Sequence, residues 1–182
     1  MIKQAILATI LIAFGVFINL ILGPPLGPFL FAFGLLGVCT LRADLFTGKC
    51  GYMWRTDRKL WLILTVNIIG GYLIGLFLGW AFPALHGLAV AQLGLIQTIP
   101  DWTYFISSVF CGMIMFMAVE MYNRGNILGI IYGIPLFIFC GFRHCIADII
   151  LMGIARGYYF YFPMAIFGNL LGSIIIRELA NE

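Results

Sequence analysis

The sequence predicts an all-α integral membrane protein with six transmembrane helices in two inverted three-helix repeats. Three observations predict this fold class. Of the 182 residues, 63% are hydrophobic and 9% are charged, whereas soluble domains carry about 25% charged residues. Six apolar stretches of about 20 residues, the length that crosses a bilayer, follow one another along the chain. Polar residues interrupt the second and the fifth stretch, at corresponding places in the two halves.

The composition also limits the architecture and the function. Six spans of about 20 residues use about 120 positions, so the remaining positions form short connections. We therefore expect a single transmembrane channel domain over residues 1–182, embedded in a lipid bilayer. A soluble monomer is excluded, and no room remains for a nucleic-acid-binding or catalytic domain outside the membrane.

The first half, residues 1–82, holds three predicted spans. The first covers residues 4–22 and ends at the tight reversal Gly23-Pro24-Pro25. The second covers residues 26–46 and is broken at Thr47-Gly48-Lys49. The third, residues 60–82, is rich in glycine, which lets neighbouring helix backbones approach closely.

A connection without Lys or Arg, residues 83–101, is predicted to be an outer loop. The second half, residues 102–182, holds three more spans, at residues 102–121, 127–154 and 159–176. The middle one is interrupted at residues 141–144. Both halves thus consist of a plain span, an interrupted span and a span with an Asn-x-x-Gly motif.

The Asn-x-x-Gly motif supports an internal repeat. Asn67 and Gly70 correspond to Asn169 and Gly172, 102 residues later. Because each half has an odd number of spans, consecutive halves face opposite ways across the bilayer.

The charges of the connections predict the orientation. With the N-terminus inside, seven cations face the cytoplasm and Arg156 alone faces outward. Cytoplasmic loops carry an excess of Lys and Arg, so we expect a multi-pass protein of the inner (plasma) membrane with both termini cytoplasmic. The seven cations are Lys3, Lys49, Arg55, Arg58, Lys59, Arg124 and Arg177.

The two breaks predict a pore, because irregular backbone at membrane depth is tolerated only inside protein or beside a watery cavity. Arg42 and Asp44 precede the first break, and Arg143, His144 and Asp148 surround the second. Arg42 and Arg143 are 101 residues apart, and we expect them at matching places. Two unpaired guanidinium groups would hold an anion at the pore centre, whereas salt bridges to the aspartates would leave it nearly neutral. The sequence leaves both open.

Four motifs in order resemble those of the formate/nitrite transporter family. Ala43-Asp44-Leu45-Phe46-Thr47-Gly48 is similar to the family signature at its first break. Gly141-Phe142-Arg143-His144-Cys145-Ile146-Ala147-Asp148 is similar to the second, usually Gly-Phe-Glu-His-Ser-x-Ala-Asn. The two Asn-x-x-Gly motifs match the third and sixth helices. The resemblance covers the whole chain.

The resemblance implies an aquaporin-like fold with broken second and fifth helices and a homopentamer with one pore per protomer. It also implies passage of small monovalent anions or their conjugate weak acids. We expect no cofactor, and no metal, because no further ligand accompanies Cys140, His144 and Cys145. Family pore positions map onto His144 as the central histidine and Thr47 as its partner. Two apolar constrictions, for which core packing is the alternative, map onto Phe31, Leu35, Phe46 and Phe137.

The chain departs from the family pattern in its charges. Arg143 replaces a glutamate, Asp148 replaces an asparagine, and Lys49 follows the Thr-Gly pair. We therefore count Lys49, Arg42, Arg143 and Asp148 among the pore and substrate residues. The solute stays open among formate, nitrite, hydrosulfide and short carboxylates.

A mechanism follows from the cost of carrying a bare anion through a dry constriction, which the protonated acid largely avoids. Histidine titrates near neutrality, so we expect His144 to exchange a proton with the solute. One alternative is a channel for a small neutral solute. Others are a membrane enzyme or metal-binding protein using Cys140, His144 and Cys145, and a non-conducting scaffold.

Overall fold

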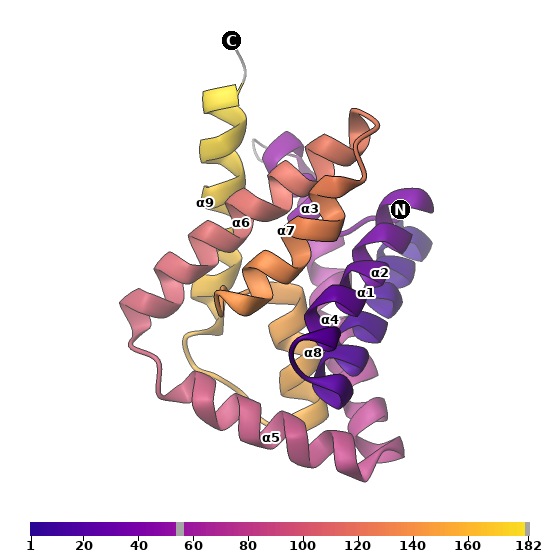
Figure 1. Cartoon of the computed structure of the whole chain (residues 1–182), viewed down its shortest axis with the longest axis vertical. Coiled ribbons are helices and arrows are strands. Elements are labelled where there is room, and N and C mark those ends of the chain that lie inside the picture. Colours follow the sequence, from indigo (N-terminus) through magenta and orange to yellow (C-terminus); the bar gives the residue numbers. More distant parts are fainter. Residues whose placement is uncertain (54–56, 181–182) are drawn as a thin grey trace.

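The computed structural model describes residues 1–53 and 57–180, and these residues form nine helices (Figure 1). Arg55, one of the seven cations that predict the orientation, lies outside the described residues. The helices are α1 (Ile2–Leu22), α2 (Leu26–Thr40), α3 (Phe46–Met53), α4 (Arg58–Ala81), α5 (Pro83–Gln97), α6 (Asp101–Asn123), α7 (Leu128–Phe139), α8 (Cys145–Ala155) and α9 (Phe162–Ala180).

Four of these helices, α1, α4, α6 and α9, are long and apolar enough to cross a membrane. They coincide with the first, third, fourth and sixth predicted spans. In the second predicted span, residues 26–46, α2 forms the first part, residues 41–45 are irregular, and α3 begins at the last residue and continues beyond the span. The fifth consists of α7 and α8, with residues 140–144 between them. Large apolar side chains are exposed on the outside, among them Phe33, Phe77 and Phe110.

Two helix pairs pack extensively, α4 against the shorter α8 and α6 against α9. Two glycines show how close the backbones come. A Cβ at Gly75 of α4 would overlap the carbonyl oxygen of Ile150, and a Cβ at Gly172 of α9 would overlap that of Val109. Without side chains at these positions the helices gain van der Waals contact along their backbones.

The first break lies earlier than the sequence predicts. Thr47, Gly48 and Lys49 are helical, and the irregular segment is residues 41–45. Arg42 and Asp44 therefore lie within the break rather than before it. The physical reason is the side chain of Asn67, whose Oδ1 accepts the N–H of Phe46 at 2.9 Å and so begins α3 at that residue.

The prediction of a loop over residues 83–101 is wrong, because α5 occupies most of that segment. Pro83 stands at its first position, where the missing N–H has no helical partner in any case. Leu85, Ala89, Leu93 and Ile96 are buried on one face, at the spacing of an amphipathic helix. This helix crosses the end of the bundle that lies away from both termini (Figure 1).

Candidate functional site

Two buried asparagines hold the two breaks in place. Asn67 of α4 donates its amide hydrogens to the carbonyl oxygens of Ala5 at 2.9 Å and Asp44 at 3.3 Å. Asn169 of α9 accepts the N–H of Cys145 at 2.8 Å and donates to the carbonyl oxygens of Arg143 at 2.9 Å and Ser108 at 2.8 Å. Each asparagine thus joins a long helix, a break and the helix after the break. The repeated Asn-x-x-Gly motif has a structural role in each half.

The same backbone hydrogen bonds recur at the two breaks with an offset of 99 residues. Ala43 N–H donates to Val38 at 2.8 Å, and Phe142 N–H donates to Phe137 at 2.9 Å. Between these bonds, Arg42 and Gly141 both have positive φ, of 52° and 69°. The equivalent of Arg42 is therefore Gly141, and the expected match between Arg42 and Arg143 is wrong. Equivalent positions of the two halves are 102 residues apart at the asparagines but only 99 residues apart at the breaks. An offset taken from the asparagines therefore misaligns the breaks by three residues.

Each break carries an acid–base pair five residues apart, and the second pair is buried whereas Lys49 of the first is partly exposed. The acid comes first along the chain in the first pair and the base comes first in the second. In the first, Lys49 Nζ lies 2.5 Å from Asp44 Oδ1. In the second, Arg143 contacts both carboxylate oxygens of Asp148, with Nε to Oδ2 at 3.2 Å. Tyr104 donates its hydroxyl hydrogen to the same Oδ2 at 2.9 Å. Of the two arrangements that the sequence leaves open, Arg143 adopts the salt bridge, while Asp44 pairs with Lys49.

His144 lies at the N-terminus of α8 and is 2% exposed. Its Nδ1 accepts the N–H of Ala147 at 3.0 Å, which caps the helix. Because a backbone amide can only donate, Nδ1 of the neutral ring carries no hydrogen, and the ring hydrogen is on Nε2. Nε2 lies 2.8 Å from Thr47 Oγ1 and donates to it. The histidine and the threonine therefore join the two breaks.

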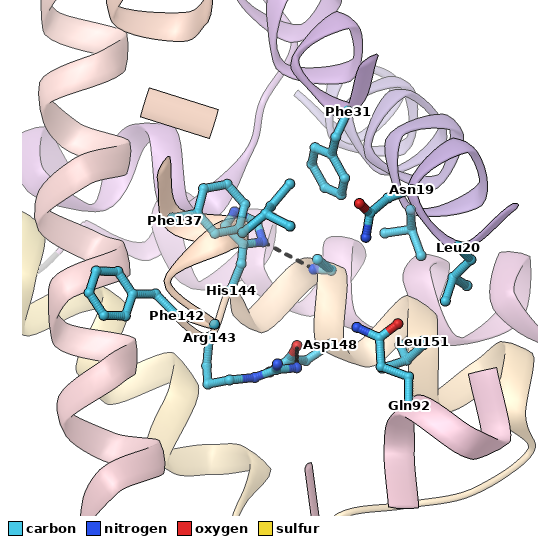
Figure 2. Close-up of a pocket in the computed structure, with 14 residues that line it drawn as sticks. Asn19, Leu20, Phe31, Gln92, Phe137, Phe142, Arg143, His144, Asp148 and Leu151 are labelled. Carbon is cyan, nitrogen blue, oxygen red and sulfur yellow. Dashed lines mark hydrogen bonds and ion pairs between the residues drawn. The ribbon is translucent and has the colours of Figure 1, made fainter. Parts of the chain in front are cut away.

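A cavity of about 130 Å³ lies on one side of this pair, and we call it the His144 hollow. Figure 2 shows His144 at its wall, with Phe31 and Phe137 on one side and Arg143 and Asp148 on another. Polar side chains from α1 and α5 complete the lining, namely Asn19 and Gln92. The salt bridge leaves the wall of this hollow with no net charge from Arg143 and Asp148.

A second cavity, of about 320 Å³, lies toward the other end of the molecule, and we call it the Lys49 hollow. Leu45 and Gly48, on either side of the segment that carries Thr47, line it together with the cations Arg42 and Lys49. The hydrogen-bonded pair of Thr47 and His144 thus lies between the two hollows.

The residues expected at the constrictions take two kinds of position. The rings of Phe31 and Phe137 lie 6.0 Å apart at 90°, and Phe137 stacks on His144 at 5.9 Å. Both phenylalanines line the His144 hollow. Leu35 and Phe46 are fully buried and line neither hollow.

Several residues of the site are missed by sequence reasoning. Tyr104 is fully buried in a span where it resembles any other aromatic residue, so no signal distinguishes it. Gln92 falls in the segment predicted to be a loop, and Leu45 precedes the constriction residue that the resemblance suggests. Asn19 is a polar residue near the end of an apolar span, which is a signal that the sequence does carry.

The five cysteines differ in burial. Cys50, Cys111 and Cys145 are buried, Cys39 is half-buried and Cys140 is exposed. Within residues 1–53 and 57–180, no group of three His, Cys, Asp or Glu side chains is placed to hold a metal ion.

The fold and the sequence can be compared with known proteins. The chain matches the formate/nitrite transporter family over residues 1–181. A structure described as an FNT family ion channel is 19% identical, with a TM-score of 0.74 over 97% of this chain and 84% of that one. A pentameric formate channel with formate bound is 18% identical, with a TM-score of 0.77 over 98% of this chain and 92% of that one. Comparison with curated proteins finds no match. The chain therefore belongs to the formate/nitrite transporter family.

Proposed function

We propose that this protein is a membrane channel for small monovalent anions or their conjugate weak acids, such as formate, nitrite or hydrosulfide. The observation that carries the proposal is the buried pair of Thr47 and His144 between two hollows, in a chain of the formate/nitrite transporter family. A solute in the His144 hollow contacts His144, and one in the Lys49 hollow lies beside Leu45 and Gly48, next to Thr47. Phe31 and Phe137 narrow the approach on the His144 side.

We propose that the channel is one transmembrane domain with two inverted repeats, residues 1–82 and 102–182, in an aquaporin-like arrangement. In this arrangement α2 with α3, and α7 with α8, cross the membrane as broken spans, giving six crossings. The hydrogen bonds that recur at an offset of 99 residues support the repeat. One solved structure with this fold is described as a pentameric formate channel, and we propose that this chain also forms a homopentamer.

The orientation follows from the charges of the connections. With both termini cytoplasmic, the Lys49 hollow opens to the cytoplasm, because the adjoining break hydrogen-bonds the start of α1 through Asp44 N–H and the carbonyl of Gln4, at 3.0 Å. The His144 hollow, next to α5, then opens to the outer side.

His144 is proposed to exchange a proton with the solute. The neutral ring cannot give up its Nε2 proton without becoming an imidazolate, so a proton must first reach Nδ1. Its arrival breaks the hydrogen bond from Ala147. The Nε2 proton then passes to the anion, and the neutral acid moves on. The ring, left with hydrogen on Nδ1, takes a proton from water on Nε2 and releases the one on Nδ1 to water, which restores the hydrogen bond from Ala147. Crossing as the acid avoids most of the desolvation cost of the charge.

The test is stopped-flow uptake of formate and nitrite into proteoliposomes with an imposed pH gradient. His144→Phe removes both the proton donor and the helix cap, whereas His144→Asn keeps an acceptor for Ala147 N–H and removes the titratable ring, together with its contacts to Thr47 and Phe137. We expect uptake that follows the pH gradient in the parent protein and loses this dependence in both variants. Uptake that keeps the full dependence in His144→Asn would refute the proton role. Uptake that ignores the gradient in the parent protein would favour the neutral-solute channel.

A further inference from the structure

Arg42 holds a backbone conformation that arginine rarely adopts. Its φ is 52°, in the left-handed region where a side chain costs free energy and glycine does not. At the equivalent position of the other break the chain has Gly141, with φ 69°. A glycine would thus fit the first break with less strain, so the arginine side chain is the feature to be explained.

The environment of the Arg42 side chain differs from that of the other cations near the breaks. Arg42 is exposed and lines the Lys49 hollow. Lys49, in the same hollow, is neutralised by Asp44, and Arg143 is neutralised by Asp148. Among residues 1–53 and 57–180, no carboxylate lies within salt-bridge distance of Arg42, and none lines the Lys49 hollow. Arg42 therefore gives this hollow one net positive charge, whereas the His144 hollow has none from its pair.

We propose that Arg42 binds the transported anion at the cytoplasmic mouth of the pore and selects planar anions with two oxygen atoms, such as formate and nitrite. This proposal rests on the proposed function and adds a binding group on one side only. A guanidinium group offers two parallel N–H donors that match two oxygens of one anion, and an ammonium group does not. Hydrosulfide and chloride have no oxygen atoms to accept these two hydrogen bonds side by side, so Arg42 attracts them mainly by charge.

The chain also supplies room for the bound anion beside the site of transfer. The Lys49 hollow, of about 320 Å³, reaches from Arg42 to Leu45 and Gly48, next to Thr47. The side chain of Asn123 lines the same hollow and donates to the hydroxyl of Tyr52 at 3.4 Å, a weak contact that an anion can replace. An anion bound by Arg42 thus occupies a cavity that extends to the residues beside Thr47, which is hydrogen-bonded to His144.

The experiment measures initial uptake of labelled formate, with the membrane potential clamped, into right-side-out and inside-out vesicles from the same expressing cells. A passive pore has equal permeability in both directions at limiting dilution, so the binding side is identified by the half-saturating concentration. We expect Arg42→Gln to raise this concentration by about three- to tenfold in inside-out vesicles, the size expected for one partly exposed charged contact. The value in right-side-out vesicles should change by less than twofold.

Two further variants separate charge, geometry and folding. Arg42→Lys keeps the charge but not the paired donors. Relative to the parent protein, this variant should bind chloride, measured as competition with formate, with less loss of affinity than it shows for formate itself. Arg42→Gly should lose formate binding like Arg42→Gln while its unfolding temperature equals or exceeds that of the parent, because the left-handed conformation suits glycine. The matched control is Arg177→Gln, a cytoplasmic-side cation that is paired with Glu178 and lines neither hollow.

The outcomes are distinct. An unchanged half-saturating concentration in inside-out vesicles of Arg42→Gln would overturn the Arg42 site while leaving the channel function intact. An equal shift in both kinds of vesicle would also overturn it, because the effect would not belong to one mouth. Absence of formate and nitrite uptake in the parent protein would refute the proposed function, and the Arg42 site with it.

Discussion

The salt bridge between Arg143 and Asp148 should behave as a buried pair whose loss is costly only when one partner is left behind. The side chains are 11% and 5% exposed, and Arg143 contacts both carboxylate oxygens. Removing one partner of a buried pair leaves an uncompensated charge, which costs about 3–5 kcal/mol. We therefore expect Asp148→Asn and Arg143→Met each to destabilise the protein by about this amount. The double variant leaves no buried charge, so it should be more stable than either single variant.

Thermal unfolding of the purified protein in detergent, followed by tryptophan fluorescence, measures the effect. For a chain of 182 residues, 1 kcal/mol corresponds to about 2–4 °C in Tm, so each single variant should lose about 6–20 °C. Tyr104→Phe removes only the hydrogen bond to Asp148 and serves as a scale for a smaller loss of about 1.5–3 kcal/mol. The reasoning is refuted if both single variants stay within about 2 °C of the parent, or if the double variant is less stable than either single one.

Three further predictions follow from the packing of the site. Asn169→Leu leaves three buried backbone groups without their partner, at about 1–3 kcal/mol each, so little folded protein should be recovered in size-exclusion chromatography; a normal yield would contradict the role of this residue. Gly172→Ala places a Cβ against the carbonyl oxygen of Val109 and should lower the Tm, whereas Gly87→Ala, in open space on α5, should leave it unchanged or raise it; equal effects would show that α6 and α9 can separate freely. Phe137→Ala widens the His144 hollow and should increase uptake of acetate relative to formate in stopped-flow measurements; an unchanged ratio would show that this ring does not limit passage.

The long spans can be predicted from the sequence because each is a continuous apolar stretch, and hydropathy alone marks it. The α5 helix is missed because its buried residues, from Leu85 to Ile96, are diluted by glycine and polar residues, and because a segment without Lys or Arg is easily read as an outer loop. The first break is misplaced for a different reason. Leu45 and Phe46 follow the charged residues Arg42 and Asp44 and extend the apolar stretch to residue 46. The actual start of α3 depends on Asn67, which lies 21 residues away in sequence.

The candidate site, like the fold, can be predicted from the sequence only in part. The resemblance brings His144 and Thr47 together correctly, since the two side chains are hydrogen-bonded at 2.8 Å. The partners of the charged residues do not follow from sequence spacing, because Asp44 is close to both Arg42 and Lys49 along the chain. The left-handed turn at Arg42 directs its backbone away from the helical path, and Asp44 pairs with Lys49 on the following helix. Tertiary geometry decides this choice.

The asparagine contacts have a consequence for how the pathway opens. Because Asn67 joins α1, the first break and the start of α3, displacing that break would rupture buried hydrogen bonds to three segments at once. The same holds for Asn169 in the other half. We therefore expect the main chain around the centre to stay fixed, and we propose that the aperture changes through rotation of single rings such as Phe31 and Phe137. The rate of solute passage should accordingly depend on the rotational barriers of those rings. It should not depend on movements of whole helices, which limit slower transporters.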